Sequence, residues 1–379
     1  MTQPRILHCH STFALGGKEA RAVRLMNAFG DRADHVVLSA VPDALSAREA
    51  IDPGVRVEFP GGAAPSLHGK PGFRRYRQLA AYMRSFDLVL TYNWGAMDAV
   101  AARRFFGRGC PKLVHHEDGF NADEAVRLNW KRNLIRQLVL DTAEHLVVPS
   151  RALQDIALDY WHYPDAVRIA NGIATARYTG PPEPASIPGL QRRDGEIIIG
   201  TLAGLRAVKN LPRLVRAVAT LGEAARLVII GEGPERDAIF AEAARVGLAN
   251  RLVMPGFLPE PHRYIGHFDV FALSSDSEQF PISLVEAMSA GLAVVATDVG
   301  DVRNMVSSKN QPFVVPAPDE DAFSAALQRL CGDADLRKAL GETNRALARS
   351  DYDERDMIGA YAALYESALG RPGALVVQR

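Results

Sequence analysis

The sequence predicts an α/β protein with two doubly wound domains and a cleft between them, and three observations lead to this fold class. The chain has 379 residues, more than one typical hydrophobic core accommodates. Short β-branched segments alternate with longer helical segments, which is the pattern of parallel sheets built from βαβ units. A proline- and glycine-rich stretch without periodicity, residues 178–196, interrupts this alternation and is typical of a linker.

The expected strands follow one another at intervals that leave room for a helix between them. In the first half they cover residues 5–10, 35–40, 56–60, 87–93, 112–117, 145–150 and 167–171. In the second half they cover residues 197–202, 226–233, 251–256, 270–275, 293–298 and 313–316. After Pro318 the sequence is typical of helices up to the C-terminus, including residues 354–369.

These segments divide the chain into a domain of residues 1–178, a linker of residues 179–196 and a second domain of residues 197–350. A final helical segment, residues 351–379, is expected to pack back toward the first domain. Ligands of open α/β sheets bind at the carboxyl ends of the strands, so the cleft between two such domains is the expected active site.

Composition and charge narrow the classes of function. The formal net charge is +0, which gives no electrostatic reason to expect nucleic acid as a partner. Cys9, Cys110 and Cys331 are far apart, and none lies at metal-ligand spacing from another cysteine or a histidine. The N-terminal apolar run is too short and too polar for a signal peptide, and no stretch is long enough to cross a bilayer. We therefore expect a cytoplasmic protein without a zinc site or a disulfide framework.

The most informative segment is residues 274–301, in which a strand ends at Ser275 and a short helix follows. Pro281 is expected as the first helical residue, where its missing N–H costs nothing, and Gly291 as the C-terminal stop. The free backbone N–H groups of the first turn would form an anion site for a phosphate. They belong to Ile282, Ser283 and Leu284.

Two carboxylates flank the expected phosphate position. Glu278 precedes the helix, and Glu286 lies more than one turn inside it. Carboxylates accept hydrogen bonds, and each suits the vicinal hydroxyls of a sugar or a ribose. A nucleotide sugar carries a ribose on one side of its diphosphate and a hexose on the other, so the arrangement suits that class of ligand.

This segment resembles the retaining glycosyltransferases of family 4 (glycosyl transferases group 1), which have the GT-B fold of two Rossmann-like domains facing a cleft. Their signature is a pair of glutamates separated by seven residues, followed by Ala-Met, a glycine and a Val-Val strand. The matching residues are Glu278, Glu286, Ala287, Met288, Gly291, Val294 and Val295. The resemblance implies that Glu286 binds the donor ribose and Glu278 the hydroxyls of the transferred sugar. Phe280 and Pro281 belong to the same donor-binding loop.

The segment after the first strand of the second domain supplies two cations. Arg206 and Lys209 precede a helix that Asn210 is expected to cap. The resemblance implies that both cations bind the donor diphosphate and stabilise its charge as it leaves, so they join Glu278 as catalytic candidates. The family often has an arginine five residues before the lysine, where this chain has Gly204. Some members instead carry the Arg-x-x-Lys that is present here.

Two further matches lie in the second domain. Gly231 and Gly233 resemble the family's Gly-x-Gly-Pro-Glu turn, whose glycines allow the backbone to approach the donor. Phe257 falls where family members line the nucleobase pocket, and the same position is equally compatible with a core residue.

The first domain matches the family in patches. Gly16 and Gly17 open a helix after the first strand, and the resemblance implies that their backbone approaches the donor phosphate and the reacting sugar. Ser150 is a plausible N-cap of a later helix. Ala174 stands where the family usually has an aspartate, which weakens a donor role for that turn.

The strand at residues 112–117 carries the position where the family has a histidine near the transferred carbon of the donor sugar. His116 is the favoured residue for this role, and His115 and Asp118 are the alternatives. Glu117 and Asp118 are candidates for contact with the acceptor.

Basic and aromatic residues gather in three segments of the first domain, residues 70–78, 102–108 and 127–137. These segments suit an anionic membrane leaflet or an acidic acceptor. Solvated helix faces with excess arginine explain them equally well.

The resemblance implies a retaining transfer of a hexosyl or N-acetylhexosaminyl group from a nucleotide sugar to a glycan or lipid-linked acceptor, as in polysaccharide biosynthesis. It implies no cofactor and no metal, because the cations and the helix N-terminus stabilise the leaving diphosphate. The protein is then cytoplasmic, with peripheral attachment to the inner face of the membrane left open.

Three other functions compete with this interpretation. A nucleotide-sugar epimerase shares the fold class but not the glutamate signature. An NAD oxidoreductase is disfavoured because no strand is followed by Gly-x-Gly-x-x-Gly. A catalytically silent partner that binds nucleotide sugars is favoured by Gly204 and Ala174.

Overall fold

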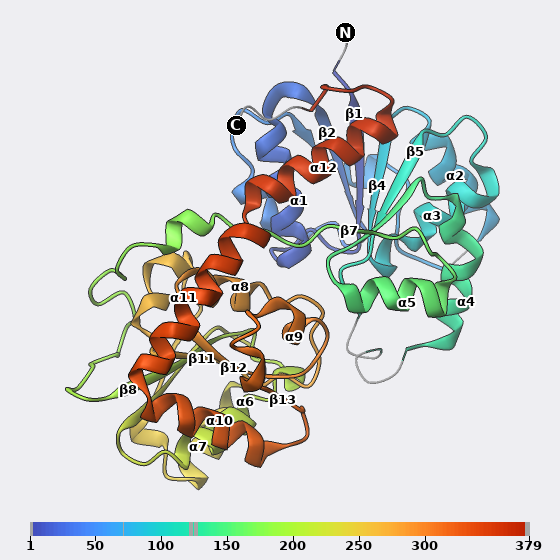
Figure 1. Cartoon of the computed structure of the whole chain (residues 1–379). Helices are drawn as coiled ribbons and strands as arrows, with labels where there is room; N and C mark the ends of the chain where they lie inside the picture. The colour runs from blue at the N-terminus through green and yellow to red at the C-terminus, as the bar shows by residue number, and fades with distance from the viewer. Residues whose placement is uncertain (1–2, 71, 121–123, 125–127, 376–379) are drawn as a thin grey trace. The chain divides into compact units, whose positions relative to one another are not determined.

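The computed structural model describes residues 3–70, 72–120, 124 and 128–375, and it separates into two compact units. Unit 1 comprises Met1–Asn171 and Arg355–Arg379, and unit 2 comprises Gly172–Glu354. Each unit is a parallel sheet flanked by helices (Figure 1). The prediction of two doubly wound α/β domains followed by C-terminal helices is confirmed.

Within the described part of unit 1, seven parallel strands pair in the order β3-β2-β1-β4-β5-β6-β7. Their bounds are β1 Arg5–His10, β2 Asp34–Ser39, β3 Val57–Glu58, β4 Leu88–Tyr92, β5 Lys112–His116, β6 His145–Val148 and β7 Val167–Arg168. Every strand expected from the sequence is present, with ends that differ by a few residues.

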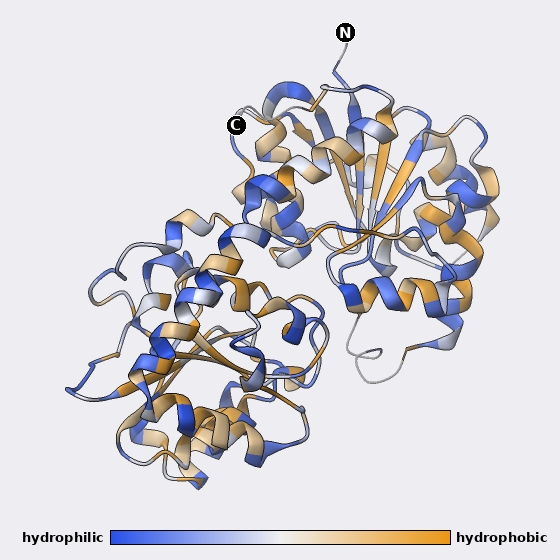
Figure 2. Ribbon diagram, in the orientation of Figure 1, coloured by the Kyte–Doolittle hydropathy of each residue, from blue (hydrophilic) through white to orange (hydrophobic). Residues whose placement is uncertain are grey.

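The helices of unit 1 cover both faces of this sheet. They are α1 Gly17–Phe29, α2 Phe73–Met83, α3 Met97–Phe106, α4 Trp130–Val139, α5 Arg151–Trp161 and α12 Glu354–Leu369. Side chains alternate along each strand, so Leu7 and Val89 pack toward α2, α3 and α5, whereas Ile6 and Leu88 pack toward α1 and α12. Figure 2 shows the apolar strands between helices that carry both polar and apolar residues.

Within the described part of unit 2, six parallel strands pair in the order β10-β9-β8-β11-β12-β13. Their bounds are β8 Ile197–Leu202, β9 Ala225–Ile230, β10 Leu252–Gly256, β11 Val270–Leu273, β12 Ala293–Thr297 and β13 Val314–Val315. The helices are α6 Leu211–Ala219, α7 Arg236–Arg245, α8 Ile282–Ser289, α9 Val302–Met305, α10 Glu320–Gly332 and α11 Ala334–Asp351. These strands also match the sequence-based expectation.

Side-chain caps fix where several helices begin. Asn210 Oδ1 accepts from the backbone N–H of Arg213 at the start of α6, and Ser150 Oγ accepts from that of Leu153 at the start of α5. Both caps were expected from the sequence. Among the described residues, no helix combines the length and apolar character needed to span a bilayer.

The chain passes between the units at two neighbouring segments. Ile173 pairs with Asp353 in an isolated parallel bridge, and the backbone N–H of Glu354 donates to Ile173 O. Residues 179–196, the expected linker, belong to unit 2, and the helical segment from Arg355 belongs to unit 1. Unit 1 is therefore built from two stretches of chain that are far apart in the sequence.

Each sheet has one point at which the strand order reverses. In unit 1 the reversal falls between β1 and β4, and in unit 2 between β8 and β11. Loops that leave the carboxyl ends of such neighbouring strands go to opposite faces of the sheet and leave a crevice between them, which is where open α/β sheets bind ligands. These two places hold the candidate site residues.

Candidate active site

Lys209 and Glu278 meet at the reversal point of unit 2. Lys209 follows β8 and Glu278 follows β11, and Lys209 Nζ lies 2.5 Å from Glu278 Oε1. The sequence suggested both residues separately, and the neighbouring positions of β8 and β11 bring them into contact. A mostly buried cation and carboxylate at such a crevice suit a phosphate and a sugar hydroxyl, respectively.

Backbone contacts hold the two loops together. The N–H of Asp276 donates to Val208 O over 2.8 Å, and Ser275 Oγ donates to Glu278 Oε1 over 2.7 Å. Gly300 has a φ of 56°, and a Cβ at this glycine would lie 2.1 Å from Glu278 O. Only glycine therefore lets the loop after β12 pass so close to the backbone of Glu278.

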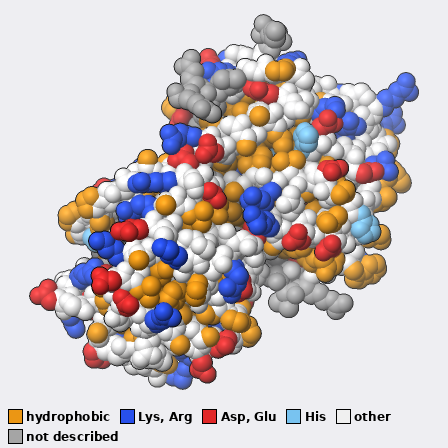
Figure 3. Space-filling view, in the orientation of Figure 1, with side chains coloured by type: hydrophobic (Ala, Val, Ile, Leu, Met, Phe, Trp, Pro, Cys, Tyr) orange, Lys and Arg blue, Asp and Glu red, His pale blue; other side chains and the backbone are white. Residues whose placement is uncertain are grey.

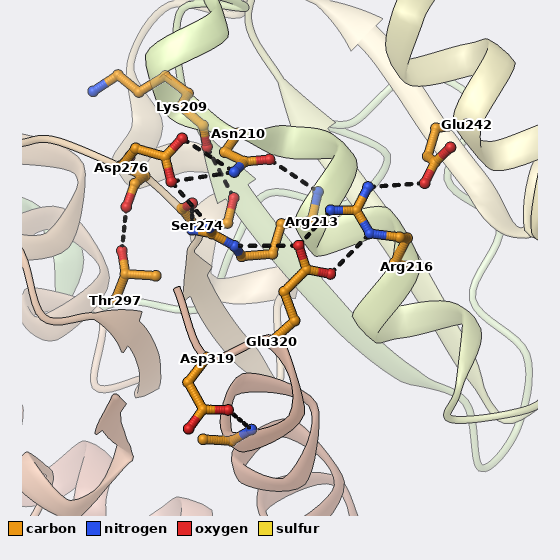
Figure 4. A network of polar contacts seen from close by, with 12 residues as sticks. Lys209, Asn210, Arg213, Arg216, Glu242, Ser274, Asp276, Thr297, Asp319 and Glu320 are labelled. Atoms are coloured by element: carbon orange, nitrogen blue, oxygen red, sulfur yellow. Dashed lines mark hydrogen bonds and ion pairs between the residues drawn. The ribbon is translucent and has the colours of Figure 1, made fainter. Parts of the chain in front are cut away.

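A network of ion pairs beneath Lys209 fixes helix α6 (Figure 4). Asp276 pairs with Arg213 over 2.9 Å, and Arg216 joins Glu320 to Glu242. The Lys209 side chain points away from this network in Figure 4, and only its backbone oxygen takes part, as an acceptor from Ser274. Asp276 thus has a structural role, and the charge of Lys209 is left for Glu278 or a ligand.

The start of α8 differs from the expectation. Pro281 is the N-cap, with ψ of 110°, and the helix runs over Ile282–Ser289. The N–H of Leu284 donates to Pro281 O over 3.1 Å, so the prediction that it is free was wrong. Within the described chain, the N–H groups of Ile282 and Ser283 have no partner, which leaves two donors for an anion.

Glu286 lies on α8, contacts Tyr178 and lies near Tyr264, two tyrosines that the sequence did not point to. Tyr178 Oη donates to Glu286 Oε1 over 3.2 Å. Burial, followed by the nearby Glu286 carboxylate, raises the pKa of Tyr264. Tyr178 and Glu286 are 108 positions apart in the sequence, so no local sequence pattern indicates their contact.

The other donor-side candidates divide into exposed and packed residues. Arg206 is exposed in the loop after β8, and Phe257 is 63% exposed after β10, which rules out the alternative of a core position for Phe257. Phe280 is buried against Tyr352, with ring centroids 5.6 Å apart. Its packing against α11 argues for a structural role.

The glycines after β9 serve the packing of the loop after β8. Gly231 has a φ of 143°, and a Cβ there would lie 1.9 Å from Ala203 O. A Cβ at Gly233 would lie 2.4 Å from Leu205 O. The close approach expected from the Gly-x-Gly turn is thus an approach of protein backbone, which shapes the loop that carries Arg206 and Lys209.

The reversal point of unit 1 carries a polar pocket of about 410 Å³. Its lining residues come from the loops after β1, β4 and β5 and from α1 and α4, and they include Ser11, Thr12, Lys18, Glu19, Asn93, Trp94, Phe120, Glu124 and Arg136. Burial lowers the pKa of Lys18 to about 8. Gly16, the N-cap of α1, also lines the pocket, and Gly17 is the first residue of that helix.

His116 is not available for the role that the sequence suggested. It is fully buried, Nδ1 contacts Thr91 O at 3.1 Å, and Nε2 contacts Tyr365 Oη at 2.8 Å. Burial, followed by the nearby Arg21, lowers the pKa of His116 to about 3. Both ring nitrogens are occupied beneath α12, so this placement argues against contact with a donor sugar.

His115 is equally buried and points into unit 1. Its Nδ1 contacts Thr91 Oγ1 at 2.8 Å, and its Nε2 lies 3.6 Å from Glu117 Oε2. Glu117 in turn accepts from the buried Arg136 over 3.2 Å. His115 and Glu117 therefore support Arg136 at the floor of the polar pocket.

Asp118 is the remaining candidate of that strand, and Arg21 holds it. Arg21 Nη2 donates to Asp118 Oδ2 over 2.8 Å, while Asn93 Oδ1 accepts from the backbone N–H of Asp118. Burial opposes ionisation of Asp118, but Arg21 outweighs it and keeps the pKa of Asp118 below its usual value. Asn93 has a φ of 54°, and this unusual conformation lets it join the loops after β4 and β5.

The fold is that of the GT-B class of proteins. The model of Glycosyltransferase Family 4 matches residues 15–177, and the model of Glycosyl transferases group 1 matches residues 183–347. Together the two matches cover most of residues 15–347, with one match in each unit. The chain belongs to this family of glycosyltransferases.

Two characterised relatives each align with part of this chain. The 2-deoxystreptamine glucosyltransferase of Streptomyces kanamyceticus is 31% identical over 50% of this chain and 51% of its own length. The N-acetylgalactosamine-N,N'-diacetylbacillosaminyl-diphospho-undecaprenol 4-alpha-N-acetylgalactosaminyltransferase of Campylobacter jejuni is 30% identical over 41% of this chain and 43% of its own length. The chain thus spans about half the length of each.

Among solved structures, Alr3699/HepE of Anabaena in complex with UDP superimposes with a TM-score of 0.78. The match covers 96% of this chain and 100% of the other at 19% identity, which shows a shared fold. The same Anabaena protein has also been crystallised with UDP-glucose.

Proposed function

We propose that the chain transfers a glycosyl group from a nucleotide sugar bound by unit 2 to an acceptor bound by unit 1, with retention at the anomeric carbon. The observation that carries this proposal is the Lys209–Glu278 contact at the reversal point of the unit 2 sheet, in a chain of the glycosyltransferase family. The titles of the relatives, which name sugar transfer and UDP or UDP-glucose, support a nucleotide-sugar donor.

The donor's diphosphate is proposed to lie between Lys209 and the start of α8. The N–H groups of Ile282 and Ser283 supply two hydrogen bonds, and Arg206, which is exposed, adds a second cation. These groups stabilise the negative charge that appears on the diphosphate as it leaves, which is the role that a divalent metal has in other transferases. We accordingly propose a metal-independent reaction.

The two glutamates are proposed to hold the rings on either side of the diphosphate. Glu286, which accepts from Tyr178, takes the ribose hydroxyls, and Glu278 takes hydroxyls of the transferred sugar. We propose that the acceptor attacks from the face that the diphosphate leaves, with the departing phosphate oxygen accepting the acceptor's proton. This route needs no protein nucleophile and retains the anomeric configuration.

Donor binding is the first expected result. A screen of UDP-, GDP- and ADP-sugars is expected to raise the melting temperature with one base, because ligand binding to the folded state stabilises it by mass action. The variant Glu286→Gln is expected to lose about tenfold in donor affinity, since an ionised acceptor contributes about 1.5–3 kcal/mol to a hydrogen bond. If no nucleotide sugar shifts the melting temperature, the donor site is wrongly assigned.

Turnover then separates a transferase from a silent binding partner. A donor that binds without release of its nucleoside diphosphate in the presence of any acceptor tested would favour the silent partner. Release of the diphosphate with formation of a glycosylated acceptor supports transfer, and retention is read from the anomeric coupling of that product.

Phe257 offers a test of the nucleobase position. Because its ring is 63% exposed, Phe257→Ala is expected to leave the melting temperature of the free protein unchanged within about 1 °C. Loss of a stacked base is worth about 1–3 kcal/mol, so KM for the donor is expected to rise about 5- to 150-fold. Phe240→Ala, at a 41% exposed phenylalanine on α7, is the control. Unchanged KM in Phe257→Ala would place the nucleobase elsewhere.

A further inference from the structure

An apolar groove lies between α2, α3 and α4 of unit 1. It has a volume of about 870 Å³, within the range of ligand-binding pockets, and its lining is mainly apolar. The side chains that define it are Leu67, Tyr76, Met97, Phe105, Ile135 and Leu138. None of these residues belongs to the donor site or was singled out by the sequence for catalysis.

This groove adjoins the polar pocket at the reversal point of the same sheet. Four residues line both cavities, namely Ser11, Thr12, Trp94 and Gly95. A Cβ at Gly95 would lie 2.1 Å from Ser11 Cβ, so the absence of a side chain there is what allows the loops after β1 and β4 to pack together between the cavities. One elongated ligand can therefore occupy both, with a polar end at the strand ends and an apolar end between the helices.

The rim of the groove exposes apolar side chains to solvent. Leu138 is 53% exposed, Ile135 is 39% exposed, and Phe105 lies beside them on α3. Leu134 and Trp130 extend this apolar surface along α4, where Figure 3 shows hydrophobic side chains gathered at the edge of unit 1. Contiguous apolar surface of this kind marks a place where an apolar partner binds.

Arginines surround the outer end of the groove. A second hollow of about 600 Å³ shares Phe105 with it and is lined by Arg84, Arg103, Arg104 and Arg108. Arg84 and Arg103 donate to backbone carbonyls and form no ion pair with a described carboxylate, whereas Arg104 pairs with Asp141 over 3.4 Å. The surface around the groove therefore combines apolar side chains with positive charge, which complements an amphiphile in an anionic leaflet.

Pro71 and Arg127, in two of the basic segments expected from the sequence, lie outside the described residues.

We propose that this groove holds the hydrocarbon chain of an amphiphilic acceptor whose sugar end lies in the polar pocket beside Trp94. The inference rests on the proposed function, since it assigns the acceptor class of that reaction and the residues that recognise it. Glu19, Asn93 and Glu124 line this pocket beside Trp94 and carry oxygens that can accept hydrogen bonds from sugar hydroxyls. Arg132 and Arg136 each lie 5.2 Å from the centroid of the Trp94 ring. The acceptor is thus a lipid-linked glycan rather than a free one.

The test compares the chain with variants that place a charge in the groove. Ile135→Glu and Leu138→Glu each put a carboxylate into the apolar lining at a partly exposed position, so the fold is expected to survive. Leu158→Glu is the matched control, because Leu158 is 52% exposed on α5 and does not line the groove. Dodecyl phosphate below its micellar concentration is the probe, and inorganic phosphate is its chain-free counterpart.

Calorimetric titration is expected to show that dodecyl phosphate binds the native chain and Leu158→Glu alike, and at least tenfold more weakly to each groove variant. Inorganic phosphate is expected to bind at least tenfold more weakly than dodecyl phosphate to the native chain. Equal affinity of the native chain and the groove variants for dodecyl phosphate would overturn the proposal, as would absence of binding to the native chain.

Two further measurements distinguish this proposal from a membrane-docking surface and from the proposed function on which it rests. The first measures binding to phosphatidylglycerol vesicles. If the vesicles bind the native protein but not the groove variants, and dodecyl phosphate does not bind, the surface docks on membranes. That result would overturn the groove as a binding site for a single hydrocarbon chain. Donor-induced thermal stabilisation is expected to be the same in all variants. If the native protein binds dodecyl phosphate but no nucleotide sugar, the proposed function is refuted, whereas the hydrocarbon-binding site is still supported.

Discussion

Replacing Lys209 with methionine is expected to lower kcat by about 100- to 1,000-fold, the usual effect of removing one group that stabilises charge in the transition state. Methionine keeps the length and the apolar stem of the side chain, and Glu278 still accepts from Ser275 Oγ. The variant therefore removes the cation without leaving the carboxylate unpartnered. The measurement is the steady-state release of nucleoside diphosphate, carried out in EDTA because the proposed reaction needs no metal.

Lys309→Met is the matched control, since Lys309 is an exposed lysine of the same unit. We expect its kcat to equal that of the native chain. A Lys209→Met variant with native kcat would contradict the role of this cation in departure of the diphosphate. Activity that disappears in EDTA and returns with a divalent metal would contradict the metal-independent mechanism.

Acid is expected to unfold unit 1 at a pH that most proteins tolerate. Four buried histidines form one cluster in the sheet of unit 1: His8, His10 and His116 lie against Tyr92, and His35 contacts His8. Burial is the main cause that lowers the pKa of each, to about 4 for His35 and about 3 for His116. They are therefore neutral in the folded protein at pH values where the unfolded chain already binds protons.

Because the unfolded state binds more protons below the ordinary histidine pKa of about 6.5, the free energy of unfolding falls as the pH falls. Each histidine contributes about 1.4 kcal/mol per pH unit, and the four together about 5 kcal/mol per pH unit. Since domains are stable by only about 5–15 kcal/mol, unfolding is expected near pH 5. Above pH 7 this dependence disappears, because neither state binds these protons.

Urea unfolding followed by circular dichroism between pH 8 and pH 5 measures this slope. His35→Gln is expected to reduce it by about one proton, whereas His68→Gln, at an exposed histidine, serves as the control that leaves it unchanged. A free energy of unfolding that stays constant from pH 7 to pH 5 would show that the buried histidines do not control stability.

The sequence predicted the strands and the doubly wound fold class, whereas the order of the strands in each sheet comes from the structure. A strand can be predicted from the apolar pattern of its own segment, without knowledge of the rest of the chain. The donor-side residues Lys209 and Glu278 were found through their match to the family's motifs in the segments that follow two strands, and the pairing of β8 with β11 brings them together. Neither their contact nor its distance is visible in the sequence.

What the sequence could not supply are contacts between distant residues. His116 and Tyr365 are 249 positions apart, so nothing near the strand at β5 indicates that α12 covers this histidine. The glycines after β9 illustrate a related limit of the sequence. A position that demands glycine reveals that something approaches closely, but not whether a ligand or, as at Gly231, the backbone of Ala203 does so.

The return of the chain to unit 1 through α12 has a consequence for how the protein is made. Residues 1–171 alone lack Met357, Tyr361 and Tyr365, which complete the core between α1 and the sheet. On the ribosome, residues 1–171 must wait for α12 before this apolar core closes, while residues 172–354 form an uninterrupted unit whose chain is made earlier than α12. A single cut therefore cannot yield two independently folding units, and removal of α12 is expected to damage the domain formed by residues 1–171.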